Sequence, residues 1–224
     1  ARLGDHWYRW ERRAQAHTVR PRAPLAERTR LLHDAEERDR LMRSRSLYRD
    51  LYHGLAEVAL PVSPTTGRLL YMLAYSLKAQ TIVEFGTSFG ISTLHLAAAL
   101  RDTAGADGAG RIITTEFEPA KAARARDNLR AAGLADLVEL REGDALETLA
   151  RDLPPVIDLV LLDGAKVLYA EILALIEPHL RPGALVVADN AEHAPDYLAR
   201  IRDPANGWLS VPFGGDVELS MRLG

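Results

Sequence analysis

Residues 81–92, TIVEFGTSFGIS, decide the fold of this chain. The apolar run IVEF predicts a short buried strand. Gly86 and Gly90 allow the tight turn and close ligand approach that a side chain would block. A helix is expected over residues 91–100, with its N-terminal amide groups facing the turn. A strand, a glycine turn and a helix in this order favour a nucleotide-like ligand, although an ordinary strand-to-helix turn has the same pattern.

Acidic side chains stand near the ends of three successive predicted strands. Glu84 lies near the end of the first strand, where a buried carboxylate needs a hydrogen-bond donor such as a ligand amine or hydroxyl. Glu116 ends the strand expected over residues 111–116, where an acid can accept from both hydroxyls of a ribose. Asp144 follows the third strand, within reach of an adenine amino group or as the N-cap of the next helix. The three acids together favour a nucleoside ligand.

The spacing of the glycines separates two kinds of nucleotide site. A dinucleotide site requires G-x-G-x-x-G, and this chain has Gly86, Ser88 and Gly90 instead. A nicotinamide-dependent oxidoreductase is therefore disfavoured, although the residues alone leave it open.

Two later strands end in oxygen-bearing side chains. The segments VIDLVLLDGAK, residues 156–166, and ALVVADN, residues 184–190, are apolar strands followed by Asp163 and by Asp189 and Asn190. Neighbouring parallel strands lie about 4.8 Å apart, so these side chains can converge at one edge of the sheet. Two carboxylates and an amide suit Mg²⁺ or a similar divalent cation, and the absence of cysteine excludes a thiolate zinc site. The alternative is that the two aspartates are N-caps of the helices that follow.

The remaining pattern alternates helices with strands. Helices are expected over residues 64–77, 119–132 and 167–179, and an antiparallel hairpin over residues 207–212 and 217–221. The predicted fold class is a doubly wound, Rossmann-like α/β sheet, mostly parallel, with an antiparallel C-terminal hairpin.

The E-x-G-x-x-x-G pattern followed by a ribose-binding acid resembles the nucleoside-binding half of class I methyltransferases, over residues 61–223. The later strand ends are similar to those of metal-dependent O-methyltransferases of the catechol and caffeoyl-coenzyme A type. The resemblance implies S-adenosylmethionine as methyl donor and Mg²⁺ or a similar divalent cation. It also implies the metal ligands Asp163, Asp189 and Asn190, and Lys166 as the proton acceptor. The positions that match contacts with the methyl donor are Val62, Glu84, Gly86, Ser88, Ser92, Glu116, Asp144, Ala145 and Asp163.

Such a site would methylate a hydroxyl of a small phenolic or vicinal dihydroxy acceptor. A phenol titrates near pH 10, and a cation beside its oxygen favours the phenolate. Lys166 could take the proton if the cation and burial lower its own pKa. The small Gly164 and Ala165 predict a wider acceptor pocket than that of the animal catechol enzyme, and no C-terminal glutamate aligns for the second hydroxyl. A metal-independent methyltransferase stays the alternative.

Composition and charge indicate one catalytic domain with an N-terminal extension. The chain has 224 residues, 47% of them hydrophobic, with a net charge of −3 and no run of 18 apolar residues. We expect a cytoplasmic protein without a membrane or general nucleic-acid partner. Residues 1–54 carry 13 arginines against 8 acidic residues. They are expected to form a helical cap or homodimer contact, with an amphipathic helix over residues 25–51, whereas a nucleic-acid arm is disfavoured by the mixed charges. Residues 55–224 form the predicted methyltransferase domain.

Overall fold

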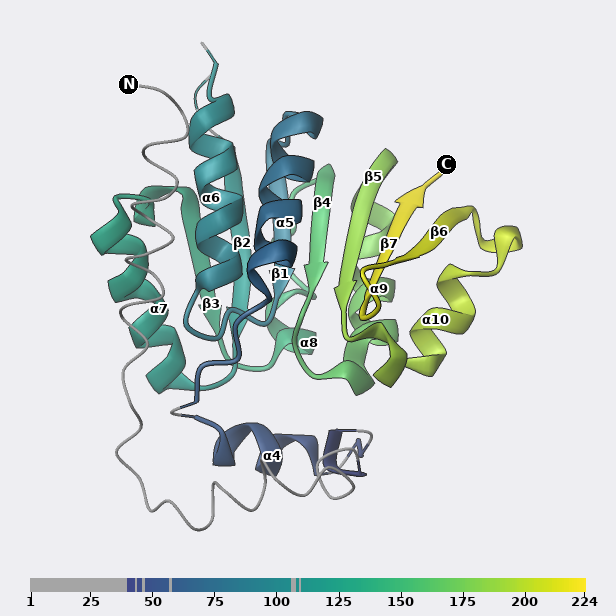
Figure 1. The fold of residues 1–224 in the computed structure, drawn as a ribbon, viewed down its shortest axis with the longest axis horizontal. Helices are drawn as coiled ribbons and strands as arrows, with labels where there is room; N and C mark the ends of the chain where they lie inside the picture. Colours follow the sequence, from purple (N-terminus) through teal and green to yellow (C-terminus); the bar gives the residue numbers. More distant parts are fainter. Residues whose placement is uncertain (1–39, 43, 46, 57, 106–107, 109) are drawn as a thin grey trace.

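The computed structural model describes residues 40–42, 44–45, 47–56, 58–105, 108 and 110–224. Its centre is one seven-stranded sheet with the order β3-β2-β1-β4-β5-β7-β6, covered by helices on both faces (Figure 1). The neighbours from β3 to β5 pair in parallel, whereas β7 is antiparallel to both β5 and β6. This topology confirms the predicted fold class, including the antiparallel hairpin at the C-terminal end.

The strands are β1 (Thr81–Phe85), β2 (Arg111–Glu116), β3 (Val138–Glu142), β4 (Ile157–Leu162), β5 (Leu180–Asp189), β6 (Trp208–Phe213) and β7 (Val217–Arg222). Every residue of the IDLVLL sequence of β4 is buried. A parallel strand with helices on both of its faces is mostly apolar, because neither face meets water, and its one charged residue, Asp158, accepts from the Gln80 and Thr81 amides and from Arg181.

The α-helices are α4 (Tyr48–Gly54), α5 (Pro64–Leu77), α6 (Ile91–Thr103), α7 (Pro119–Ala132), α8 (Ala145–Thr148), α9 (Tyr169–Ile176) and α10 (Pro195–Ile201). The bounds predicted for α5 and α7 are confirmed. Ser63 caps α5 by accepting from the Thr66 amide, and Gly133 ends α7 in the left-handed conformation. The helix predicted over residues 167–179 is divided, because 3-10 turns at Lys166–Leu168 and Glu177–His179 flank α9.

Alternate residues of the central strands belong to two separate hydrophobic cores, one on each face of the sheet. Leu159 and Leu161 of β4 pack with residues of α5, α6 and α7, whereas Val160 and Leu162 pack with α9 and α10. In Figure 1, α5 and α6 lie in front of the sheet and α9 lies behind it. The connections that leave β1 and β4 therefore run to opposite faces, and a crevice opens between the carboxyl ends of these two strands.

The chain after β1 passes directly against the chain after β4. Gly86 has a φ of +100°, and a Cβ there would lie 2.6 Å from the backbone oxygen of Asp163. The Asp163 amide donates a 2.8 Å hydrogen bond to the Phe85 carbonyl. A Cβ on Gly164 would meet the Phe85 ring at 2.5 Å. The Phe85 ring therefore fills the space against Gly164, and the wider acceptor pocket expected from Gly164 and Ala165 stays a prediction.

The N-terminal segment is described only from residue 40. The predicted helix over residues 25–51 therefore falls largely outside the described residues, as does the arginine-rich arm. Within its described part the helix is interrupted, because the chain turns at Ser44, whose hydroxyl accepts from the Leu47 amide at 3.2 Å before α4 begins. The tyrosines Tyr48 and Tyr52 pack α4 against the core that contains α9. The domain boundary at residue 54 and the homodimer stay predictions.

No helix in the part of the chain that the structure describes has both the length and the apolar character needed to cross a membrane.

Replacing Gly86 by alanine should destabilise the protein by about 2 kcal/mol or more, because the new methyl group collides with backbone at a positive φ. Gly105→Ala is the matched control, since no atom lies within 4 Å of its added Cβ. Urea unfolding followed by circular dichroism gives both free energies of unfolding. Equal stabilities of the two variants would show that the β1–β4 contact is not a constraint.

Candidate active site

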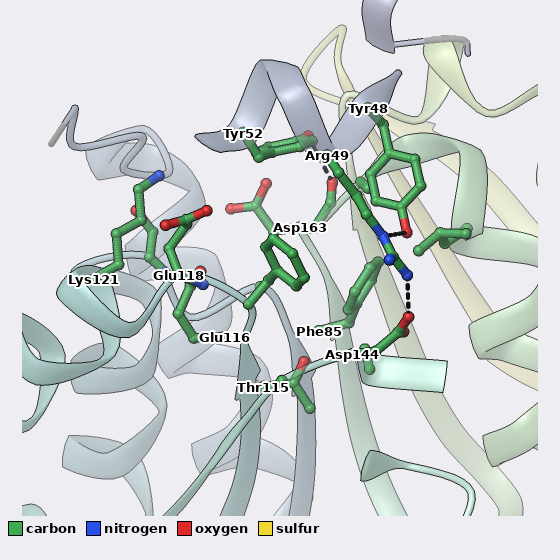
Figure 2. A pocket seen from close by; sticks show the side chains of 18 of the residues that line it. Tyr48, Arg49, Tyr52, Phe85, Thr115, Glu116, Glu118, Lys121, Asp144 and Asp163 are labelled. Carbon is green, nitrogen blue, oxygen red and sulfur yellow. Dashed lines mark hydrogen bonds and ion pairs between the residues drawn. The ribbon is translucent and has the colours of Figure 1, made fainter. Parts of the chain in front are cut away.

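A cavity of about 710 Å³, open to solvent, lies at the carboxyl ends of β1, β2, β3 and β4 beneath α4. Figure 2 shows the side chains around it. Most of the residues predicted to bind the methyl donor line it: Gly86, Ser88, Glu116, Asp144, Ala145 and Asp163. Ser92 lines a smaller cavity that shares Gly86, Ser88 and Asp163 with the first.

Glu116 is fixed at the end of β2 by backbone amides. Its Oε2 accepts from the Ser88 amide at 2.7 Å, and its Oε1 accepts from the Glu118 amide at 2.8 Å. Burial raises the pKa of Glu116, and these amide donors act against that rise. A carboxylate held in this way keeps its remaining lone pairs for further donors at the cavity wall.

Asp144 combines the two roles that the sequence left open. It is the N-cap of α8, where its Oδ1 accepts from the Leu146 amide at 2.9 Å. It also lines the cavity, and its Oδ2 is paired with Arg49 of α4 at 2.5 Å. Both carboxylate oxygens therefore have partners within the protein.

Glu84 finds its hydrogen-bond donors inside the protein rather than in a ligand. The carboxylate is fully buried, and it accepts from the hydroxyls of Ser92, Thr93 and Thr114, each at 2.5 Å. Burial raises its pKa to about 7 despite these donors. Among the predicted contacts of the methyl donor, Glu84 and the buried Val62 do not line either cavity. Their roles stay predictions, and Glu84 could act only through the hydroxyls it holds.

The structure brings Asp163 and Asp189 together. Burial, followed by the charge of the neighbouring Asp163 carboxyl group, raises the pKa of Asp189 to about 7. The capping alternative is wrong, because the 3-10 turn after β4 has Ala165 as its N-cap and the turn after β5 has Asn190. Asn190 itself is held at a φ of 48° and makes no side-chain capping bond.

Lys166 is buried between acidic and phenolic groups. Its Nζ donates to Asp163 Oδ1 at 3.0 Å and to the Tyr169 hydroxyl at 2.8 Å. Burial lowers the pKa of Lys166, but the Tyr169 hydroxyl and the Asp163 carboxylate outweigh it and hold the pKa well above the ordinary value. The low pKa that was expected for Lys166 beside a bound cation stays a prediction.

Several residues in or near the cavity belong to no motif that was recognised in the sequence. Arg49 and Tyr52 reach the cavity from α4, and Lys121 reaches it from the first turn of α7 with only 3% of its surface exposed. Asp216, in the turn between β6 and β7, adds negative charge near Asp189 and helps to raise the pKa of that residue. Of these residues, only Lys121 lies close enough in sequence to a recognised motif, five positions after Glu116, to have been found.

The predicted metal ligands can be tested against this geometry. No group of three or more His, Cys, Asp or Glu side chains within the described residues is arranged to hold a metal ion. The predicted set has two carboxylates and one amide instead, and oxygen ligands of this kind suit Mg²⁺. Asp163 and Asp189 are forced together in a buried position, which a cation would relieve. The residues present therefore fit a hard divalent ion.

Known proteins resemble this chain in sequence and in structure. A family described as "Methyltransferase domain" matches residues 83–191. Catechol O-methyltransferases of Niastella koreensis and Mycobacterium tuberculosis are 38% and 37% identical, over 62% and 63% of this chain. The chain spans 62% of the length of each of these two curated relatives. The O-methyltransferase TomG of Streptomyces achromogenes, solved in complex with S-adenosylmethionine, is 30% identical with a TM-score of 0.63, covering 74% of this chain and 82% of TomG.

The sheet topology and the crevice between the carboxyl ends of β1 and β4 are those of the α/β methyltransferase fold. More particularly, the chain belongs to the S-adenosylmethionine-dependent O-methyltransferase family that includes the catechol and caffeoyl-coenzyme A enzymes. This confirms the resemblance on which the sequence interpretation rested, and it removes the nicotinamide-dependent oxidoreductase as an alternative.

The buried Glu84 should make stability depend on pH. Its folded pKa of about 7 lies above the ordinary value of 4.5, so the stability it contributes is complete below pH 4.5 and is lost as the pH rises through 7. Between pH 4.5 and 7 the wild type should lose on the order of 3 kcal/mol of its free energy of unfolding through this group, whereas Glu84→Gln should not. The stability of Glu84→Gln relative to wild type should therefore rise by that amount as the pH rises. Urea unfolding without divalent ions, at several pH values, measures the difference.

Glu147→Gln, which alters an exposed carboxylate of α8, is the matched control, and its difference from wild type should stay constant with pH. A Glu84→Gln difference that also stays constant would show that Glu84 ionises normally in the folded protein.

Proposed function

We propose that this protein transfers a methyl group from S-adenosylmethionine to a hydroxyl of a small phenolic or vicinal dihydroxy acceptor, assisted by a divalent cation and Lys166. One observation carries the proposal: Asp163 and Asp189 meet beside the cavity that the predicted methyl-donor residues line. The relatives named catechol O-methyltransferase support the acceptor class. TomG, which was solved in complex with S-adenosylmethionine, supports the methyl donor.

The cavity offers groups for each part of the methyl donor. Glu116, held by two amides, is assigned to the ribose hydroxyls, and Asp144 to the adenine amino group. Gly86 lets the backbone pass close to the ligand between β1 and β4. Asp163 lines the cavity and is also one of the three predicted metal ligands, so it belongs to both the proposed methyl-donor pocket and the proposed metal set.

Asp163, Asp189 and Asn190 would hold the cation. When bound, a divalent ion supplies positive charge that stabilises an oxyanion of the acceptor and orients its neighbouring oxygen. The protein's part is to keep the ligand oxygens in place. Tyr169 contributes to this because its hydroxyl lies 2.7 Å from the Leu162 carbonyl oxygen and 2.9 Å from that of Asp189, and its one proton is shared between the end of β4 and the end of β5.

Lys166 is placed to handle the acceptor proton. In the structure it is a protonated ammonium paired with Asp163, so it cannot accept a proton in that state. A cation held by Asp163 would balance that charge, which is one of the causes that hold the pKa of Lys166 high, and its own positive charge would act with burial to lower that pKa. The neutral amine could then take the proton of an acceptor hydroxyl, whose ordinary pKa is about 10.

Methyl transfer should depend on a divalent ion. With S-adenosylmethionine and catechol as substrates, product detected by mass should fall about 100-fold or more when Mg²⁺ is replaced by EDTA. Asp189→Asn should lower the rate by a similar factor in the presence of Mg²⁺, whereas Asp196→Asn, which alters an exposed acid of α10, should not. Full activity after complete chelation would instead favour a metal-independent methyltransferase.

Lys166→Met should lower kcat by about 10²–10⁴-fold at neutral pH, because the acceptor proton then has no nearby base. Its rate should recover as the pH rises, as the acceptor hydroxyl ionises without help. The control Lys78→Met alters an exposed lysine at the end of α5 and should leave the rate unchanged. The measurement is kcat against pH with catechol; a near-normal kcat at pH 7 would show that Lys166 is not the base.

A further inference from the structure

Helix α4 contacts the walls of the methyl-donor cavity at three points. Arg49 is paired with Asp144 at 2.5 Å, the Tyr52 hydroxyl donates to the Gly164 carbonyl at 3.3 Å, and His53 bonds Glu118 at 3.0 Å. All three partners line the cavity, and they follow three different strands. In Figure 1 α4 lies beyond the carboxyl ends of the strands, so it bridges the mouth of the crevice.

The guanidinium of Arg49 sits in surroundings suited to a flat, nitrogen-bearing group. It lies 5.6 Å from the centre of the Phe117 ring and 5.8 Å from that of Tyr48, and it points to the Asp144 carboxylate (Figure 2). A planar guanidinium binds aromatic faces and carboxylates well. The other oxygen of Asp144 caps α8, so Arg49 takes the one oxygen that is not committed to the helix.

Adenine has the same requirements as this guanidinium. It is planar, it stacks on aromatic rings, and its amino group donates to a carboxylate. Phe117 directly follows Glu116, the residue assigned to the ribose, so the ring and Asp144 lie where an attached adenine would be. The Arg49 guanidinium lies beside Asp144 and Phe117, in the space that the amino group and ring of an adenine would need, so the two groups compete for the same place.

We propose that Arg49 occupies the adenine subsite as an internal competitor, and that methyl-donor binding displaces it from Asp144. The proposal rests on the proposed function, since it takes Asp144 as the adenine acceptor. Arg49 of α4 thereby covers the adenine subsite and weakens the binding of any adenosine ligand. Its side chain is 52% exposed, so it can leave Asp144 for solvent without unfolding α4.

The expected effect has a definite direction. An ion pair with one exposed partner is a modest interaction, so removing it should tighten binding of S-adenosylhomocysteine by about three- to tenfold. Salt screens such a pair. Raising the salt concentration should therefore move the wild-type Kd toward that of the variant that lacks Arg49.

The test is calorimetric titration of S-adenosylhomocysteine into the full chain of wild type, Arg49→Ala and Arg45→Ala. Arg45 is the matched control, because it lies four residues earlier in the chain, before α4 begins, and pairs with Glu171 at 2.8 Å, outside the cavity. Arg49→Ala should have a lower Kd than wild type, and Arg45→Ala the wild-type Kd. 5′-Methylthioadenosine, which keeps the adenosine but lacks the amino-acid part, should show the same difference.

An Arg49→Ala Kd equal to or above the wild-type value overturns the proposal; a higher value would mean that Arg49 clamps the bound adenine. Asp144→Asn separates this failure from failure of the proposed function. If S-adenosylhomocysteine binds but Asp144→Asn leaves its Kd unchanged, adenine does not use Asp144 and only the competitor proposal fails. If the wild type binds no S-adenosylhomocysteine, both proposals fail.

Discussion

The structure depends on the close contact between the chain segments that leave β1 and β4. Gly86 lies against the backbone of Asp163 with no room for a Cβ, and the Asp163 amide bonds the Phe85 carbonyl. Because the two connections then run to opposite faces of the sheet, this contact creates the crevice and fixes Asp163 at its centre. The methyl-donor cavity and the predicted metal set meet at that one residue.

Negative charge is concentrated around this contact. Asp163, Asp189 and Asp216 lie near one another, and burial together with their mutual repulsion raises the pKa of Asp189 to about 7. The one buried cation in direct contact with Asp163 among the described residues is Lys166. A further cation would offset this negative charge, which is the physical reason that a divalent ion and a neutral Lys166 belong to the same hypothesis.

The motif residues and the surrounding helices have different kinds of task. Glu84 holds three hydroxyls inside the fold, while Glu116 is held by two amides and faces the cavity. Helix α4 closes over these groups through side chains such as Arg49, which belong to no motif. The strands therefore set where ligand groups can bind, and the N-terminal helix affects how readily they do so.

The sequence by itself determined the strands, the bounds of α5 and α7, the hairpin and the family, because these depend on local patterns of apolar residues, proline and glycine. It also located Asp163 and Asp189 at one edge of the sheet, since parallel strands end together. Only the tertiary structure decided that Glu84 satisfies its carboxylate internally, that Phe85 fills the space at Gly164, and that Arg49 reaches Asp144. These contacts join residues distant in the chain, and no spacing rule encodes which side chains fill the space between them.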